Sequence, residues 1–151
     1  MTEPGSEDLT VEDAAEPAKY RVYADTPLDE VVDLMVRRGL RAIPVVGERY
    51  EVLGIITTGD ALGRVLREAP SEEGEAAGAG APTARDIMTR AVLCVSEAQP
   101  LVDAARMMVN RKVEQLPVVR DGELVGLVTR NAVLRALHGE THDERDDPNE
   151  T

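Results

Sequence analysis

The chain has 151 residues, a formal net charge of -12, three Tyr and neither Phe nor Trp. This length is enough for one compact body with a continuous core. The acidic balance and the shortage of aromatic rings argue against a nucleic-acid partner, because phosphate binding needs a net basic face and single strands are usually held by stacking. The opening residues resemble no signal peptide and no apolar run approaches a membrane span, so we expect a cytoplasmic protein without a membrane partner.

Most of the charge lies at the two ends of the chain. Residues 1–18 contain six acids and no base, and residues 139–151 contain six acids and one Arg, whereas residues 19–138 contain 16 bases and 17 acids. Because like charges repel each other and little apolar surface is present, both ends are predicted to be disordered acidic tails.

Neither the histidines nor the cysteine predicts a reactive site. His138 and His142 could bind a metal if one helix ran through both, but Gly139 between them favours the end of a helix. Cys94 is the only cysteine and lies in an apolar run, so we interpret it as a small buried hydrophobic residue. The sequence therefore predicts no metal site and no disulfide.

The body begins with a short strand over residues 20–24. Thr26-Pro27 then provides an N-cap followed by a Pro in the first turn, and apolar residues at helical spacing predict a helix that ends at Gly39. Two β-branched runs follow, residues 43–46 and 52–56, and the Gly-containing turn between them predicts a hairpin.

The sequence T-T-G-D at residues 57–60 differs chemically from the hairpin before it. It places two hydroxyls, a Gly and a carboxylate where the second strand should give way to a helix over residues 59–68. Because a helix start carries unpaired N–H groups and the positive end of the dipole, this turn suits a phosphate or another polar ligand group. Alternatively, Thr58 or Asp60 merely caps the helix.

Residues 69–83 are rich in Gly, Pro and Glu and predict a flexible connector. After it the chain repeats itself at an offset of 73 or 72 residues. The matching pairs are Pro27-Leu28 with Pro100-Leu101, Leu34–Val36 with Met107–Val109, Ile43–Val46 with Leu116–Val119, and Gly54–Thr57 with Gly126–Thr129. Each β-α-β-β-α unit is too small to bury its sheet alone. Two such units are expected to pack sheet to sheet about a pseudo-two-fold axis, in an α/β (α+β) fold.

The two h-P-V-V, turn, G-h-h-T segments, together with A-R-D-I-M-T at residues 84–89, resemble the paired cystathionine β-synthase (CBS) motif, or Bateman module. The resemblance covers residues 19–138 and implies a first motif at 19–68 and a second at 84–138. It implies a stand-alone regulatory module that binds an adenosine-containing ligand, namely AMP, ADP, ATP or S-adenosylmethionine, and requires no cofactor. Each cleft of the family combines the Thr-x-x-Asp of one motif with strands of the other motif.

By this resemblance, the first cleft would hold the ribose hydroxyls on Asp60, with Thr57 towards the ribose or phosphate. The remaining members of this cleft would come from the second motif and enclose the adenine: Val92, Leu93, Val113, Gln115 and Pro117. The second cleft would use Arg41, Ala42, Ile43, Thr129 and Asn131. Since Ala132 stands where the family has Asp, the second cleft is expected to be empty or weak. A polyphosphate in the first cleft would need a cation such as Arg130, because Glu114 and Gln115 replace the basic residues that often precede the strand Pro.

Two other classes of function are weighed against the ligand sensor. The first is a CBS module that binds nothing and serves only for assembly, since some of the family's binding residues are lost. The second is an enzyme, which the sequence disfavours because no nucleophile with a base is visible. A homodimer is expected through the second helix of each motif, whose apolar residues are Leu62, Val65 and Leu66 in the first and Val133, Leu134 and Leu137 in the second. A regulated protein on another chain is a possible further partner.

Overall fold

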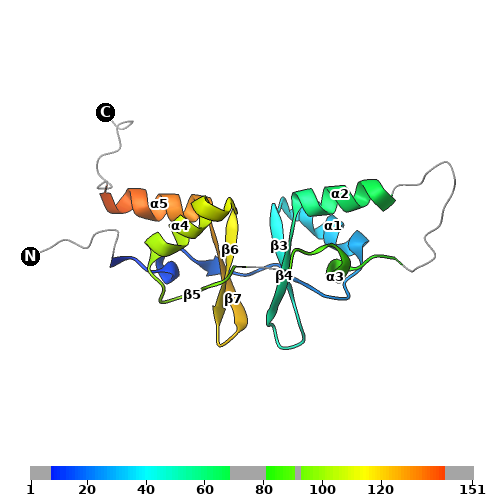
Figure 1. The fold of residues 1–151 in the computed structure, drawn as a ribbon, viewed down its shortest axis with the longest axis horizontal. Coiled ribbons are helices and arrows are strands. Elements are labelled where there is room, and N and C mark those ends of the chain that lie inside the picture. The colour runs from blue at the N-terminus through cyan, green and yellow to red at the C-terminus, as the bar shows by residue number, and fades with distance from the viewer. Residues whose placement is uncertain (1–7, 69–80, 91–92, 142–151) are drawn as a thin grey trace, which may run out of the picture. The chain divides into compact units, whose positions relative to one another are not determined.

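A computed structural model describes residues 8–68, 81–90 and 93–141 of the chain. The chain divides into two compact units. We call residues 19–92 the first-motif unit, and residues 1–18 together with 93–151 the second-motif unit. Figure 1 shows the elements of each unit as ribbons. Two sheets with helices confirm the predicted mixed α and β class.

The first-motif unit is built on a three-stranded sheet in the order β2-β3-β4. Strand β3 (Ala42–Val46) runs parallel to β2 (Val22–Tyr23) and antiparallel to β4 (Val52–Thr57). Helices α1 (Leu28–Arg38), α2 (Thr58–Glu68) and α3 (Ala84–Ile87) lie on one side of the β3–β4 hairpin in Figure 1.

The core of this unit follows from the spacing of apolar residues. Helix α1 buries Leu28, Val31 and Met35 at intervals of three and four, which places them on one helical face. They pack against strand residues such as Ile43 and Ile56, both fully buried. Gly39 ends α1 with φ 63°, in the left-handed region that Gly adopts without a steric cost, as the sequence predicts.

The second-motif unit repeats this arrangement and adds a strand from the N-terminus. Its sheet has the order β1-β7-β6-β5. The elements in chain order are a short 3-10 helix η2 (Val11–Asp13), β1 (Glu16–Pro17), β5 (Val95–Ser96), α4 (Leu101–Arg111), β6 (Gln115–Arg120), β7 (Glu123–Thr129) and α5 (Arg130–Thr141). Helix α4 buries Leu101, Ala104 and Met108, the counterparts of the three buried residues of α1.

The prediction of a disordered tail over residues 1–18 is wrong for the part of it that lies within the described residues. Val11 is fully buried in the second-motif core, and its backbone N–H donates to the carbonyl of Gln99 at 2.8 Å. Glu16 and Pro17 then pair with β7. The count of acids misled the prediction because the acids point outward, while the few apolar residues between them provide the packing.

The segment before each motif belongs to the unit of the other motif. Residues 84–90 lie in the first-motif unit, although the sequence assigned them to the second motif, and residues 8–18 lie in the second-motif unit. Thr89 bridges Ile55 of β4, with N–H···O distances of 3.0 and 2.8 Å in the two directions. We call residues 8–17 the first lead-in and residues 83–90 the second lead-in.

Gly54 and Gly126 make room for these lead-ins. A Cβ atom on Gly54 would lie 2.6 Å from the carbonyl oxygen of Thr89, and one on Gly126 would lie 2.8 Å from that of Glu16. Real side chains do not approach this closely, so Gly at these two strand positions allows the backbones to touch. Both glycines belong to the repeated G-h-h-T segment, for which the sequence offered no structural reason.

Other boundaries differ from the prediction by a few residues. The last part of the connector 69–83 is ordered, since the carbonyl of Pro82 accepts from the Leu28 N–H at 2.9 Å. Helix α5 continues to Thr141, past the predicted end of the second motif at 138. Residues 69–80 and 142–151, with most of the predicted connector and acidic tail, lie outside the described residues.

The second helices expose less apolar surface than the sequence predicts. Leu62, Val65 and Leu66 on α2 are exposed. On α5, however, Val133 is buried in the core of its own unit and Leu137 packs against that core, which leaves Leu134 exposed. The predicted set was too large because one face of α5 has to cover its own sheet.

Candidate functional site

Asp60 and Thr57 form a reciprocal capping box at the start of α2. The backbone N–H of Thr57 donates to Asp60 Oδ2 at 3.0 Å, and the backbone N–H of Asp60 donates to Thr57 Oγ1 at 3.1 Å. These bonds satisfy donors that an uncapped helix start would leave unpaired. Of the two predicted capping residues, Thr58 or Asp60, the structure confirms Asp60, whose partner is Thr57, while Thr58 is the first residue of α2.

A third group, Thr89 of the second lead-in, also contacts the Asp60 carboxylate. The Thr89 hydroxyl donates to Asp60 Oδ2 at 3.3 Å. Within the described residues, every hydrogen bond that Asp60 accepts goes to Oδ2. An ionised carboxylate has about four lone-pair positions on its two oxygens, so Oδ1 can accept further hydrogen bonds. Sequence reasoning missed Thr89 because it lies 29 residues from Asp60.

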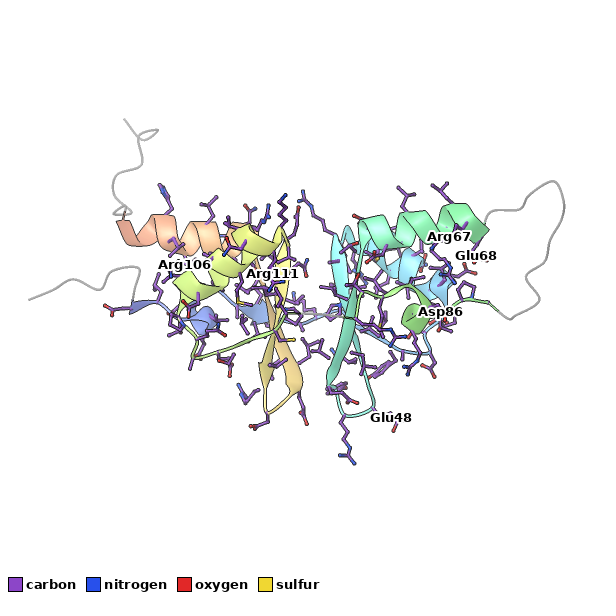
Figure 2. All side chains as sticks on the ribbon, viewed as in Figure 1. Glu48, Arg67, Glu68, Asp86, Arg106 and Arg111 are labelled. Carbon is purple, nitrogen blue, oxygen red and sulfur yellow. The ribbon has the colours of Figure 1, made fainter. Side chains whose placement is uncertain are left out.

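The same Thr-x-x-Asp pattern caps both lead-ins. The backbone N–H of Thr10 donates to Asp13 Oδ2 at 2.8 Å, and that of Thr83 donates to Asp86 Oδ2 at 2.8 Å. The second bond lowers the pKa of the Asp86 carboxyl, because it stabilises the charged form. Figure 2 labels Asp86 at the start of α3. The pattern by itself is thus a capping signal, and a binding role for Asp60 needs other support.

The start of α5 keeps the hydroxyl of this arrangement and lacks the carboxylate. Thr129 Oγ1 accepts from the backbone N–H of Ala132 at 3.1 Å. The methyl group of Ala132 lies in the second-motif core and is 6% exposed. Arg130, expected as a cation for phosphates, instead donates from Nε to the carbonyl of Val113 at 2.9 Å. Its guanidinium therefore helps to hold the turn after α4.

The remaining residues predicted for the first cleft differ in their packing and in their position in the fold. Leu93 and Val113 pack against the second-motif core. Gln115 begins β6, and its side-chain Oε1 is buried without a hydrogen-bond partner. Pro117 lies in β6 opposite Leu127. Val92 lies outside the described residues.

The residues predicted for the second cleft differ in burial. Ile43 packs in the core of its own unit and is 0% exposed to solvent, and Ala42 is 7% exposed. Because strand residues alternate between faces, these two side chains point to opposite faces of β3, and both are buried. Arg41 and Asn131 are exposed at the start of β3 and in the first turn of α5.

A family model described as the CBS domain matches residues 11–67 and 84–139. The chain belongs to the CBS domain family. The match begins at Val11, which agrees with the packing of the first lead-in and not with a motif that starts at residue 19. The resemblance that the repeated segments predicted is confirmed.

Relatives of known structure have the same fold. CBSX2 of Arabidopsis thaliana, solved in complex with AMP, is 29% identical with a TM-score of 0.73, and the match covers 89% of this chain and 99% of that one. The CBS domain pair of protein MJ0100, solved with 5'-methylthioadenosine and S-adenosyl-L-methionine, is 25% identical with a TM-score of 0.66, and the match covers 87% and 98%. Protein MK0525 of Methanopyrus kandleri, described as uncharacterized, is 30% identical over 124 residues, which span 80% of this chain and 60% of that protein.

The first-motif unit of this CBS chain also contains a pocket of about 780 Å³ at the far end of the β3–β4 hairpin from Asp60. Glu48, labelled at the hairpin tip in Figure 2, lies on its wall. The lining carries charges of both signs, from Asp25, Glu48, Glu51, Arg49 and Arg85. Beside it Tyr23 and Tyr50 stack with ring centroids 6.5 Å apart. None of the predicted cleft residues lines this pocket.

Three further observations concern function classes. Among the described residues, no cluster of three or more His, Cys, Asp or Glu side chains could hold a metal ion. Within the same residues, no helix has the length and apolar character needed to cross a membrane. Cys94 is half-buried, and desolvation raises the pKa of its thiol, which favours the unreactive protonated form.

Proposed function

We propose that this CBS chain is a regulatory module that senses an adenosine-containing ligand, with Asp60 as the ribose-binding residue. The main support for this proposal is the hydrogen bonding of the Asp60 carboxylate. Its Oδ2 accepts from Thr57 and Thr89, while Oδ1 has no hydrogen bond among the described residues. A carboxylate oxygen held in this way is preorganised to accept from the vicinal hydroxyls of a ribose.

The ligands of two solved relatives support the proposed ligand class. CBSX2 was solved with AMP, and the MJ0100 domain pair with 5'-methylthioadenosine and S-adenosyl-L-methionine. These molecules share an adenosine group and differ in what the 5' position carries. We therefore propose adenosine as the recognised part, and AMP, ADP, ATP and S-adenosylmethionine as candidates.

By the family resemblance, residues of the second motif would supply the other contacts to this ligand. Leu93, Val113 and Pro117 would enclose the adenine. The buried and unpartnered Oε1 of Gln115 is a candidate acceptor for an amino group. Arg130 is not proposed as a phosphate ligand, because its guanidinium is bonded to backbone carbonyls. The second cleft, with Arg41, Ala42, Ile43, Thr129 and Asn131, is proposed to be weak or empty.

The alternative proposal is a CBS module used only for assembly. It is favoured by the apolar residues that both units expose at equivalent places: Val36 and Val109 on the first helices, and Leu62 and Leu134 on the second helices. Such matched residues suit the two-fold contact of a homodimer. The ligand sensor could use the same dimer to reach a regulated protein. In either case we propose a cytoplasmic protein that is not an enzyme.

A thermal-shift screen separates the two proposals. The purified protein is heated with AMP, ADP, ATP, S-adenosylmethionine or 5'-methylthioadenosine at several concentrations, with guanosine monophosphate as the control. A ligand at 100 times its dissociation constant should add about 2.7 kcal/mol to the free energy of unfolding, and the melting temperature should rise with concentration. If no adenosine compound raises the melting temperature, the assembly role replaces the sensor.

A further inference from the structure

Thr89 is held in place by its backbone more firmly than its exposed position would suggest. Its N–H donates to the Ile55 carbonyl at 2.8 Å, and its carbonyl accepts from the Ile55 N–H at 3.0 Å. Gly54 lets this pairing come close, since any side chain there would meet the Thr89 carbonyl. The hydroxyl of Thr89 therefore reaches Asp60 from a fixed backbone position.

The second-motif unit has the same backbone contact with different side chains. Glu16 lies opposite Leu127 of β7, as Thr89 lies opposite Ile55 of β4. The offsets are 72 residues between the two strand positions and 73 between the two lead-in positions, as in the rest of the repeat. In this register Glu16 occupies the place of Thr89, and Ala132 occupies the place of Asp60.

Both residues of the Thr89–Asp60 hydrogen bond are therefore replaced in the second-motif unit. By this register, the two positions that carry a hydroxyl and a carboxylate in one unit carry a carboxylate and a methyl group in the other. If an acid stood at 132, it would find the like charge of Glu16 where Asp60 finds a donor. Two carboxylates at one place repel each other unless one of them takes up a proton.

We propose that Thr89 is a positioning residue for the ligand carboxylate Asp60, and that Glu16 together with Ala132 keeps the equivalent site of the second-motif unit from forming. The inference rests on the proposed function, because it assigns Thr89 the task of turning Oδ1 towards the ribose. It also gives the second lead-in a part in ligand binding.

The first test replaces the Thr89 hydroxyl. Thr89→Val keeps the shape and removes the donor, while Thr89→Ser keeps the donor and serves as the matched control. AMP affinity measured by calorimetry should fall about 3- to 10-fold in Thr89→Val, as for the loss of one ordinary hydrogen bond, and should stay within about twofold in Thr89→Ser. Thr89→Val that binds AMP as tightly as the wild type overturns the inference and leaves the proposed function standing. A wild type that binds no adenosine compound overturns both.

A measurement without ligand tests the same contact. In urea, Thr89→Val should lower the unfolding midpoint of the wild type and have no effect when Asp60 is already Ala. Equal effects in the two backgrounds would show that the two side chains do not act together, which contradicts the inference even if AMP binding changes.

The second-motif unit provides the reverse test. Ala132→Asp alone should lower the unfolding midpoint and leave the number of AMP molecules per chain unchanged. Adding Glu16→Thr to Ala132→Asp should bring the unfolding midpoint most of the way back to the wild-type value and allow a second AMP to bind. Glu16→Thr alone should neither raise the midpoint nor allow a second AMP to bind. A second AMP bound by Ala132→Asp alone, or no rescue by Glu16→Thr, overturns the role assigned to Glu16.

Discussion

At the level of single residues, Asp60 uses one carboxylate oxygen, Oδ2, to cap a helix. Its other oxygen, Oδ1, has no hydrogen bond among the described residues. The sequence predicted both uses of T-x-x-D, because capping and anion binding depend on the same few residues. It could not predict Thr89, since nothing local to Thr89 indicates that it lies beside Asp60. It also did not indicate that the whole of β3, Ile43 included, is buried.

The cap of the second lead-in should make the protein sensitive to acid. The Thr83 backbone N–H lowers the pKa of Asp86 below its ordinary value, so the ionised carboxyl stabilises the fold. A carboxyl with a lowered pKa contributes stability above the unfolded pKa of about 4, and this contribution is lost as the pH falls through the lower folded value. Asp86→Asn should be less stable than the wild type at pH 7 and should approach it near pH 3, as read from urea midpoints. A constant difference at all pH values would contradict the assigned cause.

The lead-ins are the elements that the sequence predicted least well. Helices and hairpins followed from periodicity, from Pro27 and Pro100, and from the turn glycines, and these predictions are confirmed within a residue or two. The first lead-in was mistaken for a tail because it has only two buried side chains, Val11 and Ala14, among its acids. Its partner lies more than 100 residues away in β7, and such a pairing leaves no local pattern.

Val11 tests whether the first lead-in is part of the fold. Val11→Ala removes two methyl groups from a fully buried position and should cost about 2 kcal/mol of the free energy of unfolding. Glu12→Ala, the exposed neighbour in η2, is the control and should change it by less than about 0.5 kcal/mol. Chemical denaturation gives both values. If the two substitutions have equal, small effects, residues 8–17 do not pack as described.

The whole molecule is a repeat whose two units exchange their lead-ins. The sequence repeat predicted two similar units, and the structure has them. The repeat gave no sign that each lead-in pairs with a strand of the other motif. Sequence adjacency suggested the opposite assignment. As a result, the first-motif unit is one continuous segment, residues 19–92, whereas the second-motif unit is built from two segments, residues 1–18 and 93–151.

The exposed apolar residues of the helices should form a dimer contact. Light scattering at high micromolar concentration should give a mass about twice the 16.3 kDa of one chain. Leu62→Lys combined with Leu134→Lys should lower the mass to one chain, because it places charges where two apolar faces meet. Arg67→Lys, at the end of α2 in Figure 2, is the control and should remain a dimer. A monomeric wild type would contradict the dimer.

The most direct test of the account compares two caps of the same kind by calorimetry with AMP or whichever adenosine compound binds best. Asp60→Ala removes a cap and the proposed ribose acceptor, whereas Asp13→Ala removes a similar cap in the first lead-in. Asp60→Ala should weaken binding by about 1.5 to 3 kcal/mol, roughly ten- to a hundred-fold, and Asp13→Ala should leave the affinity unchanged. Equal affinities in the wild type and Asp60→Ala, or equal losses in both variants, would contradict the central claim that Asp60 binds the ligand.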